Sequence, residues 1–248
     1  MEPMCSCDPT PGQPCKPKRC ARNEPSEVSI NLDSEDCTSI HCARIRVLSD
    51  RPNLLNRWGI TPGELSDIAS ENPSMRGLMF GYIAEYMLRK EWLVRPEIAN
   101  LSRPRSHDRM QKCDFLFNYR GAEIKLEVKC LDSPKVKYVD GVYSGTFQCN
   151  ASDTTPVSLP NGERLSTNCL VVGGFDLLAV CLFAFENNWR FAFALNRDLP
   201  RSVAKKYTPT QQQYLLKSSM KVTWPLAPPF SDEPFSLLDR LLAERARR

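Results

Sequence analysis

Aromatic residues are absent from the first 57 residues of the chain, because all 7 Tyr, 11 Phe and 4 Trp lie at or after Trp58. The same segment holds six of the eleven cysteines and seven of the twenty prolines. A segment of this composition contributes little to a hydrophobic core. We therefore predict an irregular Cys/Pro-rich tail over residues 1–45 and one compact domain over residues 46–248.

The chain also lacks a long uninterrupted hydrophobic run. Its longest apolar stretch, residues 170–185, is interrupted by Asp176 and is shorter than the roughly 20 residues that a membrane-spanning helix needs. No basic segment followed by an apolar one opens the chain, as a secretory signal would. Five cysteines lie singly within apolar stretches, which is typical of reduced thiols. These absences predict a cytoplasmic protein without a membrane partner.

The N-terminal cysteines lack the paired Cys-x2-Cys spacing of common zinc sites. The residues concerned are Cys5, Cys7, Cys15, Cys20, Cys37, His41 and Cys42. A metal-bearing interaction domain in this segment remains an alternative, and we favour an unstructured tail.

Strong basicity is likewise absent, since the net charge is only +4. This charge is compatible with nucleic-acid binding but does not by itself indicate it. Basic side chains do gather before residue 113 and after residue 189, which suits phosphate contacts; a solvated surface is the alternative. The candidate DNA contacts are Arg105, Arg109, Lys112 and Arg201.

The pattern of the remaining chain predicts helices followed by a sheet. Thr61-Pro62-Gly63-Glu64 has the form of a capping box that begins a helix. Two further features are a hairpin of alternating residues around Arg120-Gly121 and a two-residue turn at Asn187-Asn188. The predicted helices cover residues 72–90, 211–219 and 235–247, and the predicted strands cover residues 113–119, 122–130, 145–150, 175–186 and 189–195. This order predicts an α/β domain with one central sheet.

The predicted hairpin brings two carboxylates together. If residues 120–121 form the turn, Tyr119 pairs with Ala122, and the same register sets Asp114 opposite Glu127 with Cβ atoms about 4.5–5.5 Å apart. Like charges in this position destabilise a sheet unless a cation lies between them. Mg²⁺ is the natural candidate, because it binds through one or two carboxylates together with water and phosphate oxygens.

Two neighbouring features strengthen this interpretation. Glu127 and Lys129 lie two residues apart on a predicted strand and therefore share a face, although a solvated edge strand would show the same pattern. On the preceding helix, Gly77, Gly81 and Glu85 form one stripe. Glycine within a helix costs about 1 kcal/mol relative to alanine. We therefore expect the stripe to approach another backbone closely and to present Glu85 near that contact.

These residues resemble the motif of a known family. Gly81-x3-Glu85 on a helix, then Asp114, then Glu127-Val128-Lys129 on the next strand is similar to the PD-(D/E)xK superfamily of restriction-endonuclease-like nucleases. The likeness covers roughly residues 70–200. Cys113, and not proline, precedes Asp114 here. The resemblance implies that residues 46–248 form a restriction-endonuclease-like core, a central mixed β-sheet flanked by helices.

The resemblance also implies roles for individual residues. Asp114 and Glu127 would hold Mg²⁺, with Mn²⁺ as a substitute and the backbone carbonyl of Val128 as a further ligand. Lys129 would orient the attacking water and offset charge on the phosphate. Glu85 would position the metal or its waters.

Two further features of the sequence each allow more than one interpretation. Gln148 is a candidate accessory residue, and a plain polar strand position is its alternative. His107 and Asp108 would contact DNA or cap a loop. The function implied is a metal-dependent nuclease that hydrolyses phosphodiester bonds in DNA. A non-catalytic DNA-binding module of the same fold is the alternative, and a homodimer is left open.

Overall fold

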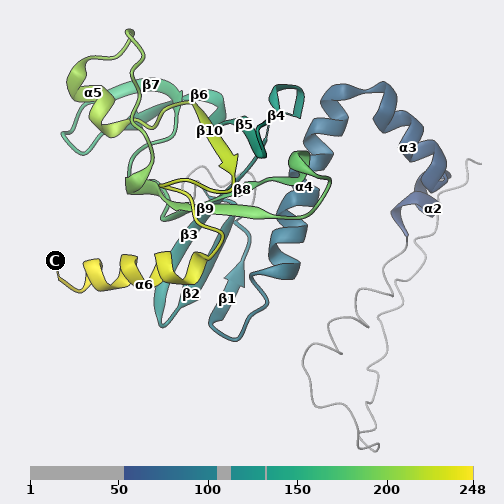
Figure 1. The fold of residues 1–248 in the computed structure, drawn as a ribbon, viewed down its shortest axis with the longest axis horizontal. Coiled ribbons are helices and arrows are strands. Elements are labelled where there is room, and N and C mark those ends of the chain that lie inside the picture. Colours follow the sequence, from purple (N-terminus) through teal and green to yellow (C-terminus); the bar gives the residue numbers. More distant parts are fainter. Residues whose placement is uncertain (1–52, 105–112, 132, 248) are drawn as a thin grey trace, which may run out of the picture. The chain divides into compact units, whose positions relative to one another are not determined.

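The structure is a computed structural model that describes residues 53–104, 113–131 and 133–247. The chain divides between Gly59 and Ile60 into two units, which are described separately. The described part of the first unit is the short helix α2 (Leu54–Trp58). The second unit holds the other described helices and strands (Figure 1). The predicted tail, its cysteines and the predicted boundary at residues 45 and 46 lie outside the described residues.

Two successive helices open the second unit at the predicted positions. These are α3 (Pro62–Glu71) and α4 (Pro73–Glu91). Thr61 caps α3 through the predicted capping box, in which its backbone N–H donates to the Glu64 carboxylate at 2.8 Å. Pro73 occupies the first turn of α4, where a missing N–H leaves no hydrogen bond unmade.

A five-stranded mixed sheet forms the centre of this unit, in the order β1-β2-β3-β8-β9. Strands β1 (Ile98–Ser102), β2 (Phe115–Tyr119) and β3 (Ala122–Cys130) form an antiparallel meander. Strand β8 (Leu177–Cys181) runs parallel to β3, and β9 (Phe191–Leu195) runs antiparallel to β8. This arrangement confirms the predicted α/β class with a mixed central sheet.

The β2–β3 hairpin has the predicted turn and register. Arg120 and Gly121 form the turn with φ of 48° and 83°, and two successive positive φ values are typical of a type I′ turn. Tyr119 pairs with Ala122, and the same register continues to the start of β2. The side chains of the hairpin therefore occupy the faces that the sequence predicted.

Two smaller sheets accompany the central one. A three-stranded sheet has the order β10-β5-β4, and a separate ribbon pairs β6 with β7. Their bounds are β4 (Lys137–Val139), β5 (Val142–Gln148), β6 (Asn150–Ser158), β7 (Arg164–Cys169) and β10 (Ser219–Trp224). The predicted strand over residues 145–150 falls on β5 but ends too late, because the Cys149 N–H donates instead to the Ser218 carbonyl at 2.7 Å.

Two local predictions were wrong. The predicted helix over residues 211–219 is limited to α5 (Pro209–Tyr214), because Leu215 and Leu216 are fully buried and form β-bridges that lead into β10. The predicted strand over residues 175–186 ends at Cys181, and the 3₁₀ turn Phe183–Phe185 follows it. Residues 187 and 188 alone therefore do not form the connection to β9.

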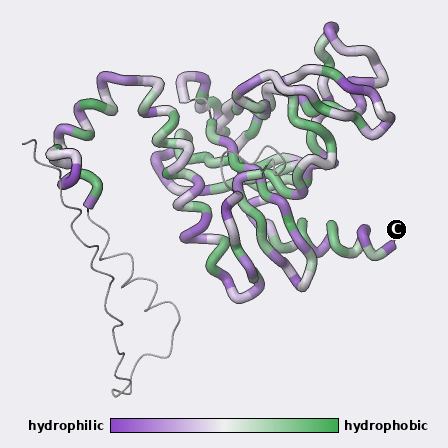
Figure 2. Tube along the Cα trace, turned by 180° about the vertical axis from the view of Figure 1, so that it is seen from behind, coloured by the Kyte–Doolittle hydropathy of each residue, from purple (hydrophilic) through white to green (hydrophobic). Residues whose placement is uncertain are grey.

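The central sheet packs on both faces. Leu177, Ala179 and Cys181 point into a core shared with α4 and the closing helix α6 (Pro234–Arg245), which was predicted. Leu178 and Val180 point into a second core, shared with β5 and β10. Hydrophobic and hydrophilic residues alternate along α6, as a helix with one buried face requires (Figure 2). Among the described residues, no helix is long and apolar enough to cross a membrane.

Candidate active site

The candidate site forms where β3 extends beyond the start of β2. The ladder between the two strands ends at Leu126, so the following residues of β3 pair only with β8. The backbone N–H of Asp114 donates to the Leu126 carbonyl at 3.0 Å. The Asp114 carboxylate accepts a hydrogen bond from the Val128 N–H at 2.7 Å. Asp114 is thus held by the strand segment that carries the Glu-x-Lys motif.

This geometry corrects one detail of the predicted hairpin. Asp114 and Glu127 do not form the directly opposed pair of the ladder, because Asp114 lies just before β2 and bonds to the backbone of Val128 instead. Both carboxylates nevertheless line the same cleft. The two carboxylates therefore lie in one cleft, as predicted, but not as a cross-strand pair.

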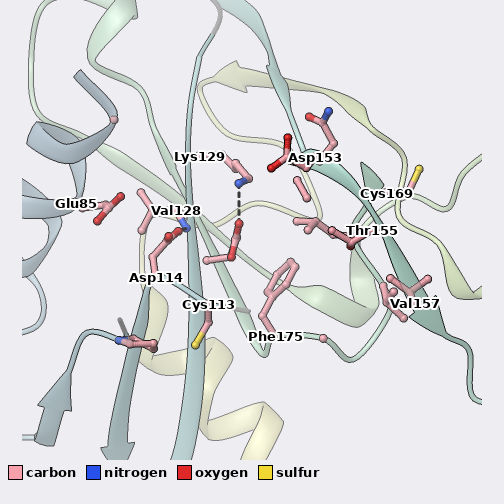
Figure 3. Close-up of a pocket in the computed structure, with 18 of the residues that line it drawn as sticks. Glu85, Cys113, Asp114, Val128, Lys129, Asp153, Thr155, Val157, Cys169 and Phe175 are labelled. Carbon is pink, nitrogen blue, oxygen red and sulfur yellow. Dashed lines mark hydrogen bonds and ion pairs between the residues drawn. The ribbon is translucent and has the colours of Figure 1, made fainter. Parts of the chain in front are cut away.

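The cleft has a volume of about 620 Å³ and lies between two walls. One wall is α4, which presents Glu85, and the other is the β6–β7 ribbon, which presents Asp153 and Thr155 (Figure 3). Asp114, Val128 and Lys129 lie between these walls (Figure 3), and Glu127 lines the same cleft. The structure therefore brings together the four side chains to which the resemblance assigns catalytic roles.

Ion pairs organise the charged groups of the cleft. The Lys129 ammonium lies 2.6 Å from a carboxylate oxygen of Glu127, as the shared face of residues two apart on a strand predicts. Arg103 forms an ion pair with Glu85. Glu127 is only 8% exposed, so its charge is shielded from water and depends on these neighbours.

Burial also changes the acidity of the carboxylates. It is the main cause that raises the pKa of Glu127 to about 7; the Lys129 ammonium opposes this shift and the Asp114 charge adds to it. Burial, and then the Asp114 charge, likewise raise the pKa of Glu85 to about 7 against the effect of Arg103. The pKa of Asp114 is also raised, mainly by burial, although the Val128 N–H opposes the shift. A bound cation would relieve this unfavourable concentration of negative charge.

The pKa of Lys129 is raised as well, but for a different reason. Burial alone would lower the pKa of Lys129, but the carboxylates of Glu127 and Asp114 outweigh it and raise this pKa. The side chain therefore stays protonated, so it can donate hydrogen bonds but cannot accept a proton near neutral pH. This state suits a group that stabilises developing negative charge.

The glycine stripe of α4 does not have the predicted role. Gly77 and Gly81 line the cleft, and a Cβ atom added to either would meet no other atom within 4 Å. The expected close approach to another backbone is therefore wrong, because the space beside the two glycines is open. Glu85, on the same stripe, does reach the site.

The remaining predicted residues lie elsewhere. Gln148 is exposed on β5, where it pairs with Ser219 of β10, and it does not line the cleft. The Arg201 guanidinium donates to the backbone carbonyls of Leu199 and Arg197, the latter at 2.7 Å, and it also lies away from the cleft. The predicted contacts that lie outside the described residues are Arg105, Arg109, Lys112, His107 and Asp108.

Several residues of the cleft were not predicted as part of it. Asn150 and Asp153 line it from β6, which belongs to the long connection between β3 and β8. No spacing in the sequence relates this connection to the motif, so no signal could have found them. Tyr82 follows Gly81 on α4 and also lines the cleft; the helical stripe shared with Leu78 could have indicated it.

Asp114 and Glu127 are the candidate donors for a divalent cation in the cleft. Within the described residues, no three His, Cys, Asp or Glu side chains are grouped so that they could hold a metal ion. Mg²⁺ does not require such a group, because one or two carboxylates with water and phosphate oxygens suffice. Asp114 and Glu127, two carboxylates that line one cleft, fit this requirement.

Comparison with known proteins adds no relative. No protein-family model, curated protein or solved structure matches the chain.

Proposed function

We propose that the protein is a Mg²⁺-dependent nuclease of the restriction-endonuclease-like class that hydrolyses phosphodiester bonds in DNA. One observation carries the proposal: Asp114, Glu127, Lys129 and Glu85 converge on a single cleft. Acidic groups that are buried and have raised pKa values beside a cationic lysine are typical of functional sites. The order of helix, aspartate and Glu-x-Lys strand, which carried the resemblance, supports the assignment of class.

The roles follow from the position of each group. Asp114 and Glu127 would hold Mg²⁺, with the Val128 carbonyl as a further ligand and Mn²⁺ as a substitute. The ion would act as a Lewis acid toward the scissile phosphate and lower the pKa of a coordinated water. Lys129 donates hydrogen bonds to the nucleophile or to the charged phosphate oxygens. Glu85, held by Arg103, orients water molecules at the edge of the site.

A cleavage assay tests the proposal. The purified protein is incubated with supercoiled plasmid, linear duplex and single-stranded DNA in Mg²⁺, in Mn²⁺ and in EDTA, beside the Lys129→Ala variant from the same preparation procedure. We expect cleavage that depends on the cation and is lost in the variant. Equal cleavage by the variant would assign the activity to a contaminating enzyme or to another site.

A non-catalytic DNA-binding module is the other outcome of this assay. It would be indicated by a gel shift of DNA without cleavage in either Mg²⁺ or Mn²⁺. Metal analysis of the same preparation tests the remaining alternative, because stoichiometric zinc or iron would indicate a metal-bearing domain in the N-terminal cysteine segment.

A further inference from the structure

The size of the cleft bears on which form of nucleic acid can enter it. The cleft volume of about 620 Å³ is within the range of about 300–1,000 Å³ that accommodates one small-molecule ligand. Glu127 is only 8% exposed within it. A cleft of this volume accommodates about one nucleotide, which favours a strand whose nucleotide is unpaired over one held in an intact duplex.

The α4 wall leaves room for such a strand. Gly77 and Gly81 line the cleft, and nothing lies within 4 Å of a Cβ atom added to either. Glycine is among the least favourable residues in a helix, and here the two positions serve no close packing within the protein. Their effect is to widen the cleft beside Glu85.

An aromatic side chain lies one residue beyond this open stripe. Tyr82 lines the cleft and is 50% exposed. The Arg103 guanidinium lies 5.1 Å from the centre of the Tyr82 ring and also pairs with Glu85. Proteins stack the bases of single strands on aromatic rings and on arginine planes. In a duplex, the bases are already paired and stacked, so none is free to occupy this position.

We infer that the cleft accepts a single unpaired DNA strand, with one base stacked on Tyr82 and the adjoining backbone passing Gly77 and Gly81 toward Asp114 and Glu127. The inference rests on the proposed nuclease function, since it names the substrate of the same site. It specifies single-stranded DNA, or an unpaired segment of a duplex, as the substrate class.

A binding measurement separates this inference from catalysis. A fluorescein-labelled oligo(dT) of twelve nucleotides and a blunt hairpin duplex of similar length are titrated in Ca²⁺, and binding is followed by fluorescence anisotropy. We expect the single strand to bind about ten-fold or more tightly than the duplex, the range given by one base–aromatic stack. Equal or tighter binding of the duplex, or no binding of either probe, would overturn the inference.

Two variants test the position of the strand. Tyr82→Ala should weaken oligo(dT) binding about ten-fold, whereas Tyr86→Ala should not, because Tyr86 is 54% exposed on the same helix but does not line the cleft. Gly81→Leu should also weaken binding while keeping or raising the melting temperature, since leucine favours helix more than glycine does. Wild-type affinity in both Tyr82→Ala and Gly81→Leu would place the strand elsewhere.

Cleavage in Mg²⁺ then distinguishes a failure of this inference from a failure of the proposed nuclease function. If the duplex is cut at the same rate as the single strand, the nuclease function stands and the inference is wrong. If oligo(dT) binds in a Tyr82-dependent manner and neither DNA is cut, the nuclease function is wrong and the single-strand site stands.

Discussion

The ammonium group of Lys129 lies 2.6 Å from a carboxylate oxygen of Glu127, two residues earlier on the same face of β3. Glu127 is buried and Lys129 is partly buried, so each charge depends on the other. A cation at the carboxylates would compete with Lys129 for Glu127, which would leave the ammonium group available to a phosphate or a water molecule. The ion pair is therefore consistent with a resting state of the proposed site.

Replacing Lys129 with alanine should abolish most turnover while leaving the carboxylates in place. A preorganised donor at developing charge contributes about 10²–10³-fold to the rate, or roughly 2.7–4 kcal/mol. Single-turnover cleavage of one DNA substrate measures the loss. Lys125→Ala is the matched control, because Lys125 lies on the same strand but does not line the cleft. Cleavage by Lys129→Ala at the wild-type rate would refute the assignment of this residue.

Removing charge from the carboxylates should abolish Mg²⁺ binding, in contrast to the effect of Lys129→Ala. Asp114→Asn and Glu127→Gln preserve size but remove the anionic oxygens that a hard cation needs, so Mg²⁺ binding measured by calorimetry should be lost. Asparagine still offers an oxygen to the Val128 N–H, and the fold should be kept. DNA binding should survive in both variants, because phosphate contacts supply most of the affinity of proteins for DNA. Unchanged Mg²⁺ binding in both variants would place the cation at another site.

Calcium should separate binding from cleavage in the wild-type protein. Ca²⁺ accepts looser coordination than the octahedron that Mg²⁺ requires, so it should support a gel shift of DNA without producing cut strands. Mg²⁺ added to the same complex should start cleavage. Efficient cleavage in Ca²⁺ alone would contradict the proposed role of the carboxylates.

The raised pKa values predict an unusual dependence of stability on pH. The pKa of both Glu127 and Glu85 rises from 4.5 to about 7 in the folded protein. Between these pH values the folded state binds more protons than the unfolded state, so stability falls as pH rises. Thermal unfolding in EDTA should therefore show a lower melting temperature at pH 8 than at pH 5.5.

Two comparisons check the origin of this trend. Glu127→Gln should reduce the trend, because glutamine has no proton to lose, and Glu85 should account for the remainder. Mg²⁺ should raise the melting temperature more at pH 8 than at pH 5.5, since it binds the deprotonated carboxylates. A trend that is the same in Glu127→Gln and in the wild-type protein would assign it to other groups.

Local signals in the sequence predicted the part of the fold that carries the motif. The capping box at Thr61 and the Arg120-Gly121 turn are properties of a few neighbouring residues, and both are present in the structure. The alternation within β2 and β3 then fixed which side chains share a face. Asp114, Glu127 and Lys129 could be brought together in this way because one short hairpin carries all three.

Non-local packing explains what the sequence did not predict. Residues 215–216 lie in a segment whose sequence predicts a helix. Their burial between segments far apart in the chain makes them extended instead. Asp153 reaches the cleft through the β6–β7 ribbon, whose pairing is independent of the motif. The glycines of α4 were expected to pack closely against another backbone, but the space beside them is open, which a sequence does not record.

The Arg120-Gly121 turn provides a test of what holds the register of the site. Gly121 has φ of 83°, and a Cβ atom added there would meet nothing within 4 Å. Gly121→Ala should therefore cost only backbone strain, about 1–2 kcal/mol, visible as a lower urea midpoint at unchanged slope. Cleavage should be unchanged, because the buried Phe117 and Tyr119 still hold β2 in register. A one-residue slip would turn Glu127 and Lys129 to the opposite face. Loss of cleavage in the folded variant would therefore show that the turn, and not aromatic packing, maintains the register.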